Sequence, residues 1–181
     1  ILSMSNKTRG RFSLPFRPPF FYGWVIVVVS SLTIFFSGPG QTYSVSTFID
    51  SYIREFGWSR FTISTMYSTG TLTAGLLMGL VGNLLDRRGH RVATTSIALV
   101  FGLACLGMSI VNSSFTMLVG FFLIRLLGQG SMSLSSSTLV PQWFIRKKGR
   151  ALSIVAIGGA AGSALIPPLN IYIIEHFGWK T

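Results

Sequence analysis

Long gaps between charged residues constrain this chain more than any other feature. Each gap exceeds the ~20 apolar residues with which a helix crosses a bilayer, and only 10% of the residues are Asp, Glu, Lys or Arg. The 49% hydrophobic content leaves too little polar material to coat a soluble globule. We therefore expect an all-α membrane protein, a multi-pass bundle of transmembrane helices. The gaps run from Arg17 to Asp50, from Arg60 to Asp86, from Arg91 to Arg125 and from Arg150 to Glu175.

The apolar stretches predict five transmembrane spans. These occupy about residues 22–48, 61–85, 92–111, 115–144 and 151–174. Residues 1–20 are expected to form a cytoplasmic N-terminal segment, and residues 21–181 one helical bundle. A sixth span could begin after Phe177, close to the last residue of the chain. We therefore interpret the chain as a C-terminally truncated fragment with five spans and the start of a sixth.

The basic residues cluster in segments that must share one side of the membrane if the spans alternate in direction. Eleven of the fifteen belong to the N-terminal segment and to the loops after the second and fourth spans. Because basic loops are retained on the inner side, we predict a cytoplasmic N-terminus and a location in the cell (plasma or inner) membrane. The clusters are Lys7, Arg9, Arg11 and Arg17; Arg87, Arg88 and Arg91; and Arg146, Lys147, Lys148 and Arg150.

The net charge of +11 raises nucleic-acid binding as an alternative. A nucleic-acid interface spreads Lys and Arg along one face of a soluble fold, whereas here they separate apolar spans. We therefore expect the lipid bilayer, and no nucleic acid, as a partner. The sequence also lacks paired acidic residues within a span, an H-E-x-x-H motif and a Gly-rich phosphate loop. We therefore expect that the protein is not an enzyme and that it has neither a cofactor nor a metal site.

The loop after the second span carries the most specific motif. From Gly82 to Arg91 it reads GNLLDRRGHR, which resembles the G-x-x-x-D-R-x-G-x-R loop of the major facilitator superfamily. The resemblance implies a conformational switch formed by Gly82, Asp86, Arg87, Gly89 and Arg91. In that switch Asp86 would pair with a loop arginine and with a helix of the C-terminal half, which is missing here. The alternative is a plain basic loop that only sets topology.

Two further stretches resemble one branch of that superfamily. Residues 143–162 are similar to the fifth-helix signature of the monocarboxylate transporters and the oxalate–formate antiporter-like proteins. Residues 21–24, Phe-Tyr-Gly-Trp, are similar to the first-helix signature of the same branch but lack its acidic residue. The resemblance implies a secondary transporter that moves a small solute by alternating access. An organic anion such as a monocarboxylate is the expected substrate.

Small residues recur at four-residue intervals on two spans. Gly75 with Gly79, and Gly158 with Gly162, form small-xxx-small patterns that let helices approach closely. The resemblance implies that these helices line the seam between the two halves, where sliding is needed. Static helix packing is the alternative.

Arg125 is the one charged residue inside a span. It lies ~15 Å along the fourth helix from its outer end, where an arginine costs at least ~2.5–3.5 kcal/mol unless it faces water or a partner. Gln129, Ser133 and Ser136 follow at helical spacing, which predicts a polar stripe directed into the bundle. Arg125 and Gln129 are therefore expected to bind substrate. The alternative is a structural arginine that donates to backbone carbonyls.

The first span is interrupted by Gly and Pro around Pro39. Non-helical backbone at membrane depth is tolerated beside a cavity or protein, and a helix that starts near Gln41 directs its positive end there. Gln41 and Tyr43 are therefore candidate substrate donors, or else the break is only a kink near the outer surface. The sequence as a whole favours a secondary active permease that uses proton coupling or exchange. The alternative is a non-transporting membrane sensor or scaffold that kept this fold.

Overall fold

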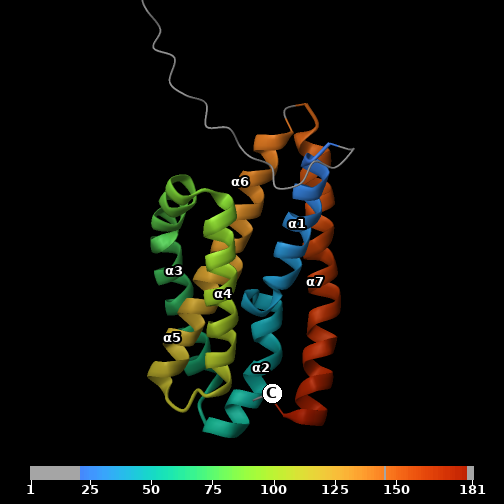
Figure 1. Cartoon of the computed structure of the whole chain (residues 1–181). Coiled ribbons are helices and arrows are strands. Elements are labelled where there is room, and N and C mark those ends of the chain that lie inside the picture. Colours follow the sequence, from blue (N-terminus) through green and yellow to red (C-terminus); the bar gives the residue numbers. More distant parts are fainter. Residues whose placement is uncertain (1–20, 145, 179–181) are drawn as a thin grey trace, which may run out of the picture.

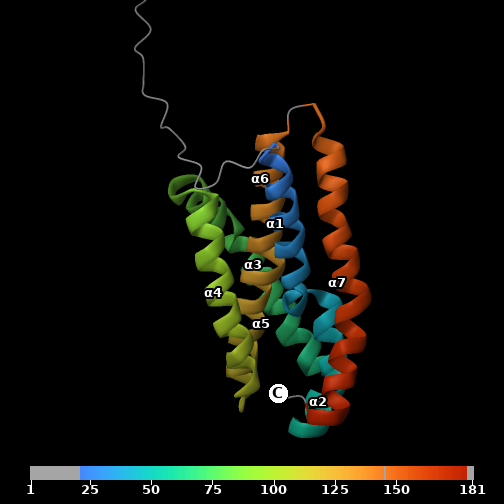
Figure 2. The same cartoon turned by 45° about the vertical axis from the view of Figure 1, so that its right-hand side comes forward.

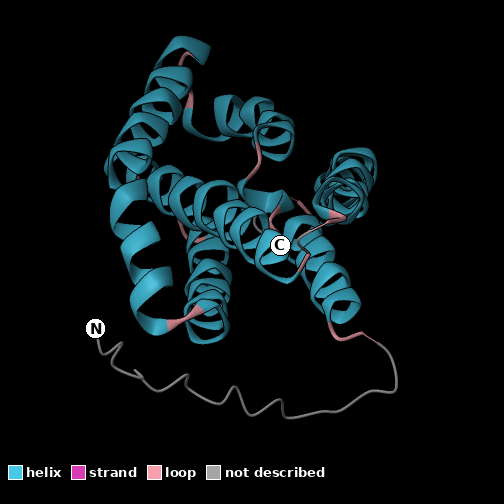
Figure 3. Cartoon of the chain, turned by 90° about the horizontal axis from the view of Figure 1, so that it is seen from above, coloured by secondary structure: helices cyan, strands magenta, loops and turns pink. Residues whose placement is uncertain are grey.

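A computed structural model describes residues 21–144 and 146–178. The expected N-terminal segment 1–20, with its basic cluster, lies outside the described residues, as does most of the expected start of a sixth span. Within the described part every regular element is a helix, as Figure 3 shows, so the predicted all-α class is confirmed. The elements are α1 (Gly23–Phe36), η1 (Gly38–Gly40), α2 (Thr42–Phe56), α3 (Arg60–Arg88), α4 (His90–Ser109), α5 (Ser114–Ile124), η2 (Arg125–Met132), α6 (Ser133–Trp143) and α7 (Lys148–Phe177).

Four helical units are long and apolar enough to cross a membrane. They are α3, α4, the continuous unit α5–η2–α6 and α7. The first span consists instead of α1 and α2 joined through the 3₁₀ turn η1. In Figure 1 consecutive units run in opposite directions, so the start of α1, the α3–α4 turn and the α6–α7 connection share one end.

The first span extends further than the sequence predicted. Its expected end was near Phe48, but α2 continues to Phe56, where Gly57 ends it in a left-handed conformation with φ +65°. The last two turns carry exposed charged side chains such as Asp50 and Arg54. Hydropathy could not reveal them as helix, because they leave the apolar stretch and remain amphipathic.

Polar side chains cap the N-termini of two helices, α3 and α5. Ser59 accepts a hydrogen bond from the backbone N–H of Thr62 at the start of α3. Ser113 and Thr116 form a reciprocal capping box at the start of α5, in the turn predicted between the third and fourth spans. These side chains satisfy N–H groups that the first turn of a helix leaves unpaired.

The distribution of apolar side chains is that of a protein in lipid. Phe121, Ile63 and Met117 are almost completely buried between α3 and α5. Large aliphatic side chains also cover the outside, as Leu76 (84% exposed) and Leu106 (70% exposed) illustrate. Such a surface is typical of contact with lipid or with further protein rather than with water, and it supports the membrane-spanning interpretation.

The η2 segment lies at the centre of the bundle. It contacts α3 and α4 on one side and η1 on the other. Helix α7 packs along α1 and α2, beside which it stands in Figure 2. The irregular segments of the first and fourth spans therefore meet in the middle of the molecule.

Candidate functional site

The break in the first span touches the fourth span at η2, which is a π-helix with wider turns than an α-helix. The two segments meet through glycines. A Cβ atom built on Gly40 would lie 2.4 Å from the carbonyl oxygen of Ile124 and 3.0 Å from the Cα atom of Gly128. Neither contact leaves room for a side chain. Gly40 and Gly128 thus let the two backbones cross in direct contact.

The local sequence explains why α1 stops at this crossing. Pro39 has no backbone N–H and cannot continue the helical ladder. The backbone N–H of Gly40 donates to the Ser37 carbonyl at 3.0 Å, which closes a tight turn, and Gln41 then adopts an extended conformation with ψ 154° before α2 starts. The broken first span predicted from the Gly and Pro residues is therefore present.

Arg125, the first residue of η2, joins three elements through its guanidinium group. Nε donates to Thr71 Oγ1 of α3 at 3.1 Å. Nη1 donates to the Gly40 carbonyl oxygen at 3.4 Å and to Thr42 Oγ1 at 3.2 Å. The central carbon lies 5.0 Å from the ring centroid of Tyr67, a cation–π contact. Every acceptor is an uncharged oxygen.

The positive charge of Arg125 has no ionic partner within the described residues. The side chain is buried, with 8% of its surface exposed. Of its five N–H groups, the two on Nη2 meet no acceptor in the described part of the chain. The guanidinium is thus held by neutral groups, and its Nη2 edge has no acceptor among the described residues.

Gln129 lies one turn after Arg125 in η2, and its Oε1 atom is buried without a hydrogen-bond donor among the described residues. This amide oxygen is therefore an unpaired polar atom in the same segment as the arginine. Further along the predicted polar stripe, Ser136 donates to the Ser30 carbonyl of α1 at 3.3 Å. That serine is a helix-to-helix link.

The two expected donors of the first span point elsewhere. Gln41 Nε2 donates to Ser37 Oγ, back within its own turn, at 3.1 Å. The Tyr43 hydroxyl faces α7, where a Cβ atom built on Gly162 would lie 3.0 Å from it. Thr42, between them, is the residue that reaches Arg125.

Sequence reasoning missed Thr42, Thr71 and Tyr67. The Tyr67 hydroxyl donates to Thr42 Oγ1 at 2.9 Å, which closes the ring of groups around the guanidinium. Tyr67 and Thr71 are four residues apart on the second span, a spacing that places both on one helix face. That spacing was a signal that could have identified them.

The two glycine pairs differ in what surrounds them. A Cβ atom on Gly158 would lie 2.2 Å from the Ser31 carbonyl oxygen, so this glycine allows α7 to pack on α1. Gly162 faces Tyr43 of α2 and the Phe35 carbonyl oxygen of α1. In contrast, Gly75 and Gly79 of α3 have no atom within 4 Å of a built Cβ among the described residues. Their small-residue face is uncovered here.

The predicted switch loop is very short. Helix α3 runs to Arg88, and Gly89 alone, with φ +78°, separates it from α4. Asp86 is exposed and forms no ion pair within the described residues. Gly82 also borders open space, and Arg87 and Arg91 are exposed. The loop therefore presents its charges outward.

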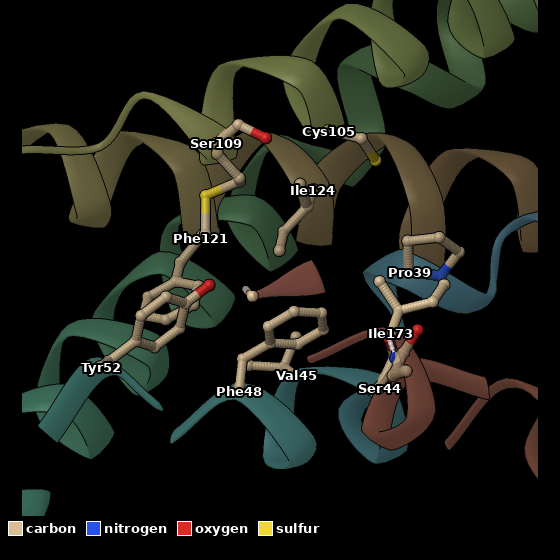
Figure 4. Close-up of a pocket in the computed structure, with 13 residues that line it drawn as sticks. Pro39, Ser44, Val45, Phe48, Tyr52, Cys105, Ser109, Phe121, Ile124 and Ile173 are labelled. Atoms are coloured by element: carbon tan, nitrogen blue, oxygen red, sulfur yellow. Dashed lines mark hydrogen bonds between the residues drawn. The ribbon is translucent and has the colours of Figure 1, made fainter. Parts of the chain in front are cut away.

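A separate cavity of about 230 Å³ lies between α2, α4, α5 and α7 (Figure 4). Its lining is mostly apolar and contains no charged side chain. Asn170 supplies a polar wall, because its Nδ2 donates to Ser44 Oγ at 2.9 Å. Pro39 and Ile124 also line it, so the cavity starts next to the Arg125 site without including the arginine.

The chain is similar to several proteins that are named for transport or efflux. A human protein, monocarboxylate transporter 6, is 31% identical over 88% of this chain and 31% of its own length. A gallate transporter of Pseudomonas putida is 27% identical over 91% of the chain and 36% of its own length. The fujikurins efflux protein of Gibberella fujikuroi is 26% identical over 85% of the chain and 34% of its own length.

The chain thus spans about a third of the length of the curated relatives that it matches. Residues 24–181 match the sequence profile of the Major Facilitator Superfamily. This match covers nearly all of the described residues, together with the Arg125 site and the Gly82–Arg91 loop. The chain therefore belongs to the Major Facilitator Superfamily, a family of membrane transporters.

Proposed function

We propose that the protein moves a small organic anion across the membrane by alternating access, and that Arg125 binds the anionic group. One observation carries the proposal: the guanidinium is buried, three neutral acceptors fix it, and no carboxylate compensates its charge among the described residues. A buried charge without a partner is unfavourable. An anionic substrate would provide the missing charge at Nη2.

The relatives support an anionic substrate. Two of the similar proteins are named for carboxylates, a monocarboxylate transporter and a gallate transporter. Others are named for the efflux of fujikurins or for multidrug resistance. Transport is inferred from family membership. The preference for a negatively charged substrate is inferred from Arg125.

The same electrostatics favour exchange or proton coupling. When an anion leaves, Arg125 again carries an uncompensated charge in a buried site, so reorientation of the empty site is costly. A second anion that binds from the other side removes that cost. A proton carried with the anion is the alternative coupling, and counterflow experiments distinguish the two.

The remaining wall of the site belongs to the part of the transporter that this chain does not contain. The uncovered glycines of α3, Gly75 and Gly79, would pack against that part. Asp86 in the switch loop would find its partner there, and the contact would form in one conformation and break in the other. The N-terminus and the switch loop would face the cytoplasm, in the cell membrane.

Uptake by the full-length protein in proteoliposomes tests the proposal. Labelled lactate, benzoate and gallate should enter with saturable kinetics, whereas their carboxamides should not. Arg125→Gln should reduce uptake at least about 10-fold, because a charged hydrogen bond is worth ~1.5–3 kcal/mol. The matched control, Arg54→Gln, removes an exposed cation and should leave uptake unchanged.

Two results would overturn the proposal. Undiminished uptake by correctly inserted Arg125→Gln protein would exclude this arginine as the anion site. Binding of a carboxylate without any uptake by the unaltered protein would instead indicate a sensor that kept the transporter fold.

A further inference from the structure

The end of the bundle that holds the α3–α4 turn and the α6–α7 connection, here called the basic end, has a strong excess of positive charge. Its basic side chains are all exposed, and Asp86 is the one carboxylate at this end among the described residues. At the opposite end described acidic side chains outnumber basic ones. The basic end carries Arg87, Arg88, Arg91, Arg146, Lys147, Lys148 and Arg150; the opposite end carries Arg54 and Arg60 with Asp50, Glu55 and Glu175.

These cations lie at helix ends that are connected to one another. Because Gly89 alone separates α3 from α4, the three arginines of the turn are fixed within one helical turn of a helix end. The imidazole Nε2 of His90 lies 3.2 Å from Gln142 Nε2, a hydrogen-bonded contact that joins the start of α4 to the end of α6. The second basic cluster begins four residues after Gln142.

Arg87 and Arg88, in the last turn of α3, complement the dipole of that helix, but the cations at the starts of α4 and α7 do not stabilise theirs. Both α4 and α7 begin at the basic end, and neither has an acidic residue in its first turn or a side-chain N-cap hydrogen bond. Lys148 and Arg150 occupy the first turn of α7 instead. Cations at a helix N-terminus oppose the helix dipole. No acidic side chain in the first turn of α4 or α7 offsets them.

Aromatic side chains cluster beside this surface. Trp24 and Phe144 pack with ring centroids 5.4 Å apart, and Tyr22 and Trp143 do so at the same distance. Phe21, at the start of α1, is 53% exposed. Such rings occupy the level of the lipid headgroups, so the basic residues that follow them reach the phosphate layer.

We propose that the basic end binds the headgroups of anionic phospholipids. The negatively charged phosphodiester compensates the cations from the plane of the bilayer, in which the aromatic cluster holds them. A positive loop that serves only membrane insertion requires no such contact in the finished protein. The proposal is independent of the Arg125 site.

Lipid retention by the purified full-length protein tests it. The protein is incorporated into nanodiscs of phosphatidylcholine with and without phosphatidylglycerol, and the affinity for labelled phosphatidylglycerol is measured. Arg146→Gln, Lys147→Gln and Lys148→Gln together should weaken it by about 100-fold, since each cation contributes about 5-fold. Lys147→Arg with Lys148→Arg keeps the charge and should bind as the unaltered protein does.

A second measurement needs no variant and remains valid if the triple variant fails to fold. The unaltered protein should prefer phosphatidylglycerol to phosphatidylcholine, and salt should reduce that preference. Equal retention of both lipids, or equal retention of phosphatidylglycerol by the triple and charge-conserving variants, would overturn the proposal. So would displacement of the lipid by inorganic phosphate at millimolar concentration, which would indicate a soluble phosphate ligand.

Discussion

The Nη1 atom of Arg125 donates to the backbone carbonyl oxygen of Gly40 at 3.4 Å, across 85 positions of sequence. The contact joins the start of the π-helix η2 in the fourth span to the turn η1 that breaks the first span. A carbonyl freed by a helix break needs a donor, and a buried guanidinium needs acceptors. Each irregularity thus satisfies the other, and any motion of η1 also moves the proposed anion site.

Thr71→Val should weaken carboxylate transport, because it leaves the Arg125 Nε–H without its acceptor while keeping the side-chain volume. The loss of one hydrogen bond to a charged group corresponds to about a 10-fold decrease in affinity. The measurement is the KM for carboxylate uptake. Thr73→Val on the same helix is the control, since Thr73 Oγ1 bonds only to carbonyls of its own helix. Equal KM values for the two variants would contradict the role of Thr71.

Gly40→Ala should abolish transport, because the new methyl group would lie 2.4 Å from the Ile124 carbonyl oxygen and push η1 away from η2. The displaced Gly40 carbonyl would also leave Arg125. Uptake and thermal unfolding in detergent are the readouts. Gly102→Ala, with open space around the built Cβ atom, should behave as the unaltered protein. Normal uptake by Gly40→Ala would show that the crossing tolerates separation.

Gly158→Ala and Gly75→Ala compare a glycine that packs against another helix of this chain with one at which a built Cβ atom meets no other helix among the described residues. Gly158→Ala should lower the free energy of unfolding by about 1–3 kcal/mol, because the methyl group overpacks the contact with Ser31. Gly75→Ala should leave the stability of this chain alone unchanged. If α3 slides against the rest of the transporter, Gly75→Leu should still slow uptake by the full-length protein. Unchanged uptake would place Gly75 against lipid.

The orientation of the bundle can be measured with single cysteines in a background that carries Cys105→Ala. Gly149→Cys lies at the basic end, and Asn112→Cys lies in the exposed turn between α4 and α5. A membrane-impermeant maleimide added to intact cells should label only Asn112→Cys. Labelling of Gly149→Cys from outside would invert the proposed topology.

The sequence predicted the all-α class and the apolar helices because burying charge in lipid is energetically costly. The same reasoning identified Arg125, since a charge at that depth must have a partner. It did not identify Thr42 or Thr71 as that partner. Threonine is neutral and common in transmembrane helices, and local periodicity carries no information about which helices become neighbours. The sequence pointed to Gln41 and Tyr43, but Thr42 reaches Arg125 and the Tyr43 hydroxyl faces α7.

The glycine patterns illustrate the same limit. Small-xxx-small spacing predicts a smooth helix face but does not reveal what covers it. Gly158 and Gly162 pack on the first span, whereas the equivalent face around Gly75 and Gly79 is uncovered among the described residues. Only three-dimensional neighbours distinguish the two cases.

Equilibrium binding of carboxylates and their carboxamides to the purified full-length protein tests the central claim most directly, because it does not depend on turnover. At least one of lactate, benzoate and gallate should bind at least about 10-fold more tightly than its amide. That preference should disappear in Arg125→Gln protein that unfolds at the same temperature as the unaltered protein. A folded Arg125→Gln variant that keeps the full preference for the carboxylate would contradict the account.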